Sequence, residues 1–351
     1  MHASVPSANL QLVAQPSKPD PHRLLTFEHG VPRRLVHKAA VSEVLLTDAL
    51  MLDTDRFVVA AQWPREHLLY NGAANGSSDP LLVAETIRQA VIYLSHRFYA
   101  VPEGHHFILD SLEFDIDAPG IPQGTGSPLA VVLDVSCVPT TDNPRRFAMD
   151  MECSIHVEGH RYGRAGLRWG AMDHRRYTML RRPEGPAPKP APTAVACGPA
   201  LRPADVGHLH ERDVLLSPVP HAAPGTWLLK VDQDHPVLFD HGSDHIPGMV
   251  LLEAFRQACH PAAQRDNASA PTPSIAVLTF AATSFSAFGR LGAPVTITSH
   301  PAPGSDDLCF GLAATQEGRT LATGIQQWVR VPKPRIPTQR SHTDREGEGR
   351  C

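Results

Sequence analysis

The chain carries one pattern of residues twice, and this duplication constrains its architecture more than any other feature. Residues 85–90 read Glu-Thr-Ile-Arg-Gln-Ala, and residues 253–258 read Glu-Ala-Phe-Arg-Gln-Ala. The match extends backwards, because the apolar segment at 43–47 corresponds to the one at 213–217. Two copies of so long a unit exclude a solenoid of short repeats. They predict an intramolecular pseudo-dimer, in a chain that exists as a monomer or a homodimer.

Length and composition agree with two ordinary globular units. The 351 residues are enough for about two domains, and 42% of them are hydrophobic. A net charge of −4 argues against a dedicated nucleic-acid binder. No apolar run approaches the roughly 20 residues that a membrane span needs. The six cysteines form no Cys-x-x-Cys pair and no signal peptide is visible, so we expect a soluble cytoplasmic protein with reduced thiols.

Proline-rich and polar stretches mark the expected boundaries. We expect disordered tails at 1–22 and 332–351 and a proline-rich linker at 181–204. The first folded unit then spans 23–180 and the second 205–331.

Each unit is expected to contain one apolar helix followed by a series of strands. In the first unit the helix covers 81–94, with Asp79 as N-cap and Pro80 at the first helical position. In the second unit it covers 247–259. Strands are expected at 56–63, 105–117, 129–138, 145–157 and 161–170, and at 227–231, 274–288, 293–299, 307–315 and 320–331. This α+β order predicts a tandem hot-dog fold, in which an antiparallel sheet wraps one central helix and the two sheets join edge to edge.

Glu253 lies in the apolar segment 249–255, which we expect to be buried on nearly all sides. A buried carboxylate without a partner protonates, and its pKa rises. Arg256 and Gln257 follow at spacings that place them on the same side of the helix. A structural ion pair is one interpretation. We favour the other, in which Glu253 is a general base with a raised pKa, so that Glu253→Gln lowers activity about 10²-fold or more with little change in stability.

Histidines and carboxylates are concentrated just before this helix: His235, Asp240, His241, Asp244 and His245. We expect His241 and His245 to take part in proton transfer near Glu253. A metal site is the alternative, but Gly242 and Pro247 indicate a loop, and no cysteine or second histidine pair completes a ligand set. No metal ion or cofactor is therefore expected.

The first copy has the same charged pair, Glu85 with Arg88, but the loop before its helix contains no histidine. Either one copy is purely structural or the two copies hold separate roles. His105 and His106, at the start of a strand, are expected to face solvent. A basic patch in the first unit is interpreted as a solvated edge, with a dock for an acidic partner or a phosphate as the alternative: Arg33, Arg34, His37 and Lys38.

Several segments resemble the A-factor synthase family of actinobacterial γ-butyrolactone biosynthesis. They are Val36-His-Lys38 with 43–47, 61–65 with the run from Asp79 to Gln89, and 239–241 with the run from Asp244 to Gln257. The start of the second helix, 246–254, is also similar to the β-hydroxyacyl-carrier-protein dehydratases, which share the hot-dog fold. The loop before this helix is shorter than the dehydratase loop, so the catalytic histidine of those enzymes has no clear counterpart.

The resemblance implies an acyltransferase that moves a β-ketoacyl group from acyl carrier protein to the hydroxyl of dihydroxyacetone phosphate. It implies functional roles for Glu85, Glu253 and Arg256. In that chemistry, backbone amides near Gly248 would stabilise the thioester oxygen. Arg256 would hold either the acceptor phosphate or the Glu253 carboxylate, and substrate contacts are also expected from Arg88 and Gln257. The alternatives are a hot-dog dehydratase or thioesterase, and a non-catalytic acyl-ligand-binding regulator.

Overall fold

The computed structural model describes residues 19–71, 75–141, 147–181, 201–265, 273–302 and 308–333. Most of the expected linker and both tails lie outside these residues. Twelve strands in the described residues form one antiparallel sheet in the order β1-β2-β4-β5-β6-β3-β9-β12-β11-β10-β8-β7. In the first unit they are β1 Leu46–Asp53, β2 Arg56–Trp63, β3 His106–Ile116, β4 Leu129–Pro139, β5 Phe147–Val157 and β6 His160–Met172. In the second they are β7 Leu216–Pro218, β8 Thr226–Leu229, β9 Ser274–Phe285, β10 Thr296–Pro301, β11 Cys309–Gln316 and β12 Arg319–Pro332.

Counted from its outer edge to the centre, the first unit has the order β1-β2-β4-β5-β6-β3, and the second has the equivalent order β7-β8-β10-β11-β12-β9. The two units are therefore related by an approximate two-fold axis between β3 and β9. These two strands pair antiparallel from Ser111 opposite Ser284 to Asp115 opposite Phe280. The edge-to-edge junction predicted from the duplication is therefore confirmed, and the fold is a tandem hot dog.

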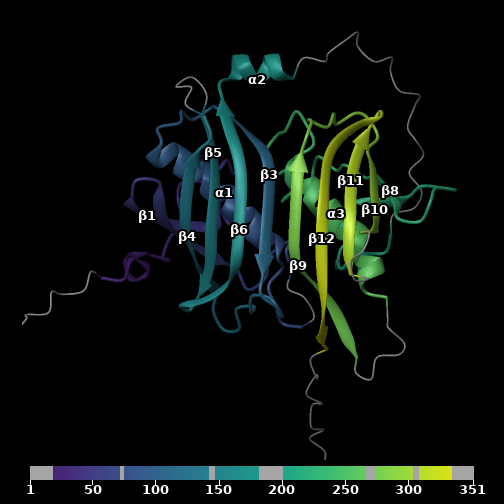
Figure 1. Ribbon diagram of the computed structural model, residues 1–351, viewed down its shortest axis with the longest axis horizontal. Coiled ribbons are helices and arrows are strands. Elements are labelled where there is room, and N and C mark those ends of the chain that lie inside the picture. Colours follow the sequence, from purple (N-terminus) through teal and green to yellow (C-terminus); the bar gives the residue numbers. More distant parts are fainter. Residues whose placement is uncertain are drawn as a thin grey trace, which may run out of the picture.

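One long helix packs on each half of the sheet. Helix α1 (Leu81–Phe98) and helix α3 (Gly248–Ala263) lie on the same side of the sheet, behind the strands in Figure 1. Both are buried on almost every side, because each is enclosed by the curve of its own half-sheet and by the segments before it. Their all-round apolar sequences follow from this burial. No helix in the described residues is long and apolar enough to cross a membrane.

Two buried tryptophans fix α1 against the sheet. The indole nitrogen of Trp63 donates to the Thr86 hydroxyl over 2.8 Å, and that of Trp169 donates to Ser95 over 3.1 Å. Because both contacts are fully buried, the rotation of α1 is fixed, and with it the side from which Glu85 projects.

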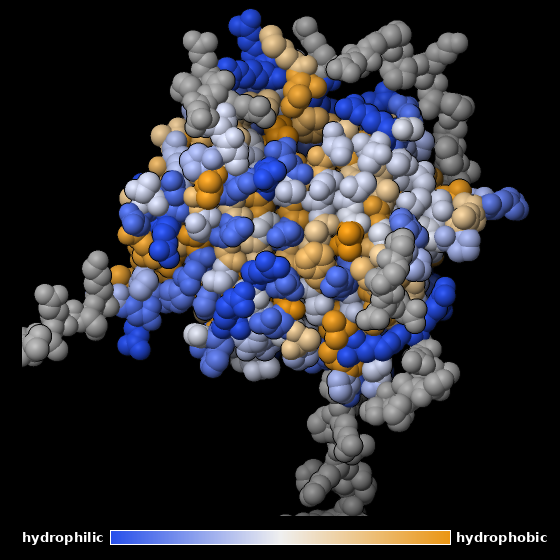
Figure 2. Space-filling view, in the orientation of Figure 1, coloured by the Kyte–Doolittle hydropathy of each residue, from blue (hydrophilic) through white to orange (hydrophobic). Residues whose placement is uncertain are grey.

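Short elements precede each long helix and supply residues to the site. They are the 3₁₀ turns η1 (Pro21–Leu24), η2 (Arg33–Val36), η3 (Val41–Glu43), η4 (Pro203–Val206) and η5 (Glu211–Asp213). Helix α2 (His174–Leu180) follows β6 and lies above the sheet in Figure 1, apart from the two long helices. On the outer face of the sheet, hydrophilic and hydrophobic residues are mixed (Figure 2).

Candidate active site between the two units

Each long helix carries a buried carboxylate that is completely surrounded by donors. In the first unit Glu85 accepts two hydrogen bonds from Arg88, at 2.9 and 2.8 Å, and one from Gln89 at 2.8 Å. Lys38, which follows η2, places its ammonium nitrogen 3.0 Å from Glu85 Oε1. The carboxylate is thus held by two cations and an amide.

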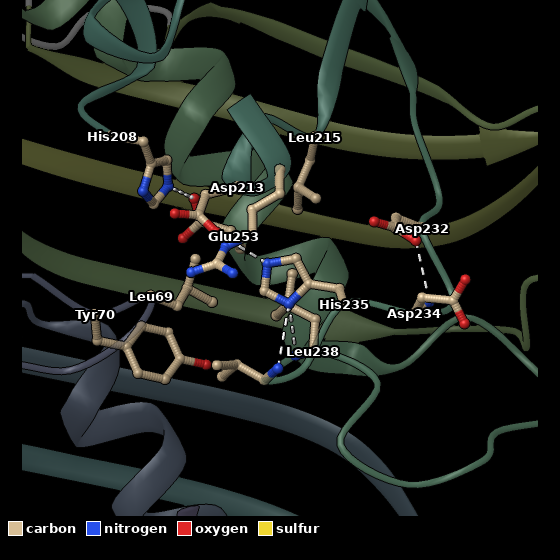
Figure 3. A network of polar contacts seen from close by, with 12 residues as sticks. Leu69, Tyr70, His208, Asp213, Leu215, Asp232, Asp234, His235, Leu238 and Glu253 are labelled. Atoms are coloured by element: carbon tan, nitrogen blue, oxygen red, sulfur yellow. Dashed lines mark hydrogen bonds and ion pairs between the residues drawn. The ribbon is translucent and has the colours of Figure 1, made fainter. Parts of the chain in front are cut away.

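The second unit repeats this arrangement with one change. Glu253 accepts two hydrogen bonds from Arg256, at 3.0 and 2.7 Å, and one from Gln257 at 2.6 Å. At the position of Lys38 stands His208, whose Nε2 lies 2.6 Å from Glu253 Oε1. Figure 3 shows His208 and His235 approaching this network from opposite sides. Glu253 is completely buried.

The two glutamines have a structural task. Gln89 accepts from the amide of Leu45 and donates to the carbonyl of Glu43. Gln257 makes the same pair of bonds to Leu215 and Asp213. Each glutamine therefore fixes its helix to the segment that enters the first strand of its unit, and Gln257 borders neither of the two cavities described below.

The pKa of Glu253 is lowered, which contradicts the raised pKa expected from its apolar surroundings. Burial alone raises the pKa of the carboxyl, but the Arg256 guanidinium and the His208 ring outweigh burial and hold it well below its usual range. Glu85 behaves in the same way, because Arg88 and Lys38 outweigh its burial. Both carboxylates stay ionised at neutral pH and are poor proton acceptors.

A large cavity of about 900 Å³ lies on the Glu85 side of the molecule. The first unit contributes Lys38, Glu85 and Arg88 to its wall, and the second contributes 240–249, the loop before α3 together with the first residues of that helix. Apolar side chains form much of the remainder: Val91, Ile92, Phe107, Leu109, Trp169, Leu251 and Phe285. The cavity is thus built by both units.

A smaller cavity of about 310 Å³ occupies the symmetry-related place. Its wall includes Arg256 and His260 of the second unit and Asp79 and Pro80 of the first. Glu253 borders neither cavity, whereas its partner Arg256 lines the smaller one.

The helix N-termini at the two cavities differ. At the smaller cavity the Asp79 carboxyl group accepts from the Leu81 amide over 2.9 Å, so a side chain already occupies the start of α1. The N-cap is Pro80 and not Asp79, one residue later than the sequence predicted. At the larger cavity no side chain caps α3. In the described residues, the amides of Gly248 and Met249 form no hydrogen bond to the protein. The larger cavity therefore offers free donors at a positive helix end.

The histidine-rich segment before α3 does not gather around Glu253. His241 and His245 line the large cavity on the Glu85 side. His245 contacts Asp244 and the hydroxyl of Tyr177 from α2. Only His235 belongs to the second network, where its Nε2 lies 3.2 Å from Asp213. Residues 240–247 lie against the first unit because α3 begins where the two units meet.

Asp240 links the units directly. Its carboxylate accepts from the amides of Ala39 and Ala40, at 2.7 and 2.9 Å, immediately after Lys38. A carboxylate of the second unit thus fixes the segment that presents Lys38 to Glu85.

One prediction about the first unit is wrong and one holds only in part. His106 is half-buried, because its ring stacks on Tyr177 with 3.8 Å between the ring centroids, and it borders the cavity. His37 and Lys38 are not part of a solvated edge, because Lys38 is buried and both line the cavity. Arg34, by contrast, is exposed and pairs with Glu103.

Sequence reasoning missed Lys38 and His208 as partners of the two glutamates. A signal was present, since Val36-His-Lys38 and Val206-Gly-His208 occupy matching places in the two copies. Each supplies a basic side chain two residues after the matching valine. Aligning the copies over this short stretch would have identified both residues.

Comparison with known proteins identifies the lineage of the chain. A family model described as the A-factor biosynthesis hotdog domain matches residues 20–173 and 194–332. The 12:0-ACP thioesterase from Umbellularia californica aligns with 78% of this chain and 98% of its own, at 9% identity and a TM-score of 0.47. That likeness is too remote to bear on the reaction.

Among characterised relatives, a 2-oxo-3-(phosphooxy)propyl 3-oxoalkanoate synthase of Streptomyces virginiae is 37% identical over 79% of this chain and 89% of its own length. A synthase of the same name from Streptomyces griseus is 31% identical over 85% of this chain and 95% of its own. The chain therefore belongs to the A-factor biosynthesis hotdog family.

Proposed function

We propose that this protein transfers a 3-oxoacyl group from a thioester to the hydroxyl of dihydroxyacetone phosphate. The product named for the Streptomyces relatives, a 2-oxo-3-(phosphooxy)propyl 3-oxoalkanoate, is the ester of those two components. A thioester is already activated, so the protein has to position the alcohol, accept its proton and stabilise the oxyanion that develops.

The observation that carries the choice of site is the difference between the two helix N-termini. Gly248 and Met249 line the large cavity and their amides have no acceptor among the described residues, whereas the start of α1 is occupied by Asp79 at the small one. We therefore place the reaction in the large cavity, beside Glu85, and assign the Glu253 cluster a structural role. The thioester carbonyl oxygen would accept from the free amides, where the helix dipole also favours negative charge.

Arg88 and Lys38 are the cations placed to receive the acceptor phosphate. Both line the cavity, and the Arg88 side chain is 19% exposed. Arg88 uses Nε and Nη2 for Glu85, and no described residue bonds its Nη1. Glu85 orients both cations, so its task here is positioning. A guanidinium held in this way presents its remaining N–H groups in a fixed direction, as bidentate phosphate binding requires.

The acyl chain would lie along the apolar part of the cavity, which is large enough for a drug-sized ligand. Helix α1 supplies Val91 and Ile92, and the seam strands supply Leu109 and Phe285. His241 and His245 border the same space and would contact the substrates from the second unit.

Acyl carrier protein is the proposed donor of the thioester. Helix α2 borders the cavity through Tyr177 and Leu180, and it exposes Arg175, Met179 and Leu180 to the exterior. A basic and apolar surface at the cavity wall suits an acidic carrier whose prosthetic arm must reach inward.

Incubation of the purified protein with 3-oxoacyl–acyl carrier protein, with and without dihydroxyacetone phosphate, tests the proposal by mass spectrometry. We expect a phosphorylated ester, or the butenolide formed when it condenses internally, only when the acceptor is present. Free 3-oxo acid at equal rates in both mixtures would identify a thioesterase and refute the transfer. An unchanged thioester in both mixtures would favour a binding protein.

A further inference from the structure

His37 is held in a backbone conformation that its counterpart in the second unit satisfies with glycine. It ends the turn η2 with φ of 52°, and Gly207 ends the matching turn η4 with φ of 77°. The left-handed region disfavours residues that have a Cβ. A strained histidine where the fold accepts glycine points to a function for the side chain.

A chain of hydrogen bonds fixes the tautomer of His37. Nδ1 of His96 lies 2.8 Å from the carbonyl oxygen of Val101, so it must carry a proton and donate. In a neutral His96 ring, Nε2 is then an acceptor. His37 Nε2 lies 3.0 Å from it and must be the donor. The lone pair of His37 is thereby assigned to Nδ1.

This arrangement is confined to the first unit. His37 borders the large cavity, next in sequence to Lys38, whereas His96 lies behind it. The residue that matches His96 in the second unit is Gln264, which directly follows α3 and bonds to Ala276 of β9 instead. The smaller cavity therefore has neither member of the pair.

We propose that His37 is the general base of the acyl transfer and that His96 is its positioning residue, an inference that rests on the proposed function. Nδ1 of His37 takes the proton from the acceptor hydroxyl as its oxygen bonds to the thioester carbonyl carbon. The C–S bond then breaks, and the sulfur leaves with its electron pair and takes the proton from the His37 imidazolium. The ester and a free thiol result, with no net change in the enzyme.

The groups around His37 make its basicity depend on whether the acceptor phosphate is bound. Burial, and then repulsion from His96, Arg88, His241 and His106, lower the pKa of His37 to about 4, so the ring is neutral at pH 7. The charged groups nearest the segment also include Lys38, Glu85 and Asp240. A phosphate dianion bound at Arg88 would offset the repulsion by that cation and raise the basicity of Nδ1 when the acceptor is present.

His37→Gly tests the proposal, because the second unit shows that this turn accepts glycine. We expect kcat to fall about 10²-fold or more, with KM for dihydroxyacetone phosphate changed only a few-fold and an unchanged melting temperature. Free imidazole, entering the space left by the side chain, should restore part of the turnover. His260→Gln, which alters a half-buried histidine at the smaller cavity, is the matched control and should keep normal turnover.

His96 is tested by two substitutions. His96→Phe removes the acceptor and should release the His37 tautomer, seen in the ¹⁵N chemical shifts of its ring, with about a tenfold loss of kcat. His96→Gln keeps an acceptor and should retain most turnover. Normal turnover of His37→Gly, or a loss of turnover that imidazole does not relieve, overturns the assignment of His37 as the base. The proposed function still stands in that case, provided that the unaltered protein forms the ester. Absence of ester from the unaltered protein refutes both.

Discussion

Lys38 reaches α1 from the turn before the first strand and places its ammonium nitrogen 3.0 Å from Oε1 of Glu85. Both side chains are almost completely buried, and together with Arg88 they form the polar wall of a cavity that is otherwise largely apolar. The second unit keeps the geometry but replaces the lysine with His208, and its carboxylate borders neither of the two cavities. The duplicated fold thus has one cluster whose carboxylate lines the large cavity and one whose carboxylate lines neither cavity.

Glu253→Gln should destabilise the protein and leave the activity of folded molecules intact. The neutral amide would leave Arg256 as a buried cation without its counter-ion, at a cost of about 3–5 kcal/mol. This reverses the outcome expected from sequence, because the carboxylate accepts from three side chains and borders neither of the two cavities. Denaturant unfolding together with turnover per folded molecule measures both quantities. The exposed Glu152→Gln is the control, and loss of turnover at unchanged stability would restore the catalytic interpretation.

Arg88→Lys and Arg256→Lys form a matched pair across the two copies. Each keeps the charge but loses the bidentate bond to its glutamate, so both should lower stability to a similar degree. Only Arg88→Lys should raise KM for dihydroxyacetone phosphate, by about 10- to 100-fold, as expected for losing a hydrogen bond to a charged group. Steady-state kinetics at varied acceptor concentration gives this comparison. Equal rises in both variants would contradict the choice of the large cavity.

The architecture was accessible from the sequence because it depends on local patterns that occur twice. The motifs at Glu85 and Glu253 sit at the same place in two helices, and their apolar neighbours follow from complete burial. The edge-to-edge junction of β3 with β9 follows from the duplication, since two like units of this fold pair through equivalent edges.

The chemistry of the site was less accessible, because it depends on contacts between distant segments. Lys38 and His208 help the two arginines to keep the glutamates ionised, yet neither lies on the helix that carries its partner. The histidines before α3 were assigned to Glu253 from proximity in sequence. Because the start of α3 faces the other unit, His241 serves the Glu85 side instead.

Gly248→Pro should lower kcat while preserving the fold. Proline occupies the matching position before α1, at Pro80, and the extended conformation of Pro247, with ψ of 147°, accepts a following proline. The substitution removes one amide donor from the large cavity, and loss of one such donor costs about 10²–10³ in kcat. Gly248→Ala adds a Cβ at 3.3 Å from the Phe285 ring but keeps the amide, so it controls for crowding. Equal turnover in the two variants would remove the amide from the mechanism.

Stability should decline as the pH falls from about 6.5 toward 5. Burial lowers the pKa of His260 to about 4. Burial together with neighbouring cationic groups lowers the pKa of His37 to about 4 as well. In this interval the unfolded chain binds a proton at each histidine and the folded chain does not, so the free energy of unfolding falls by up to about 1.4 kcal/mol per pH unit for each. His106, His156 and His241, whose pKa values burial also lowers, add to the slope.

The two buried glutamates contribute to the loss of stability only at lower pH. Because the pKa values of Glu85 and Glu253 are depressed, the stability that they provide is complete above their unfolded pKa and is lost only as the pH falls below about 4.5. Urea unfolding at closely spaced pH values separates the two intervals. The double variant His37→Gly with His260→Gln should flatten the curve between pH 6.5 and 5 and leave the decline below pH 4.5. An unchanged slope in the upper interval would show that these two rings are protonated in the folded protein.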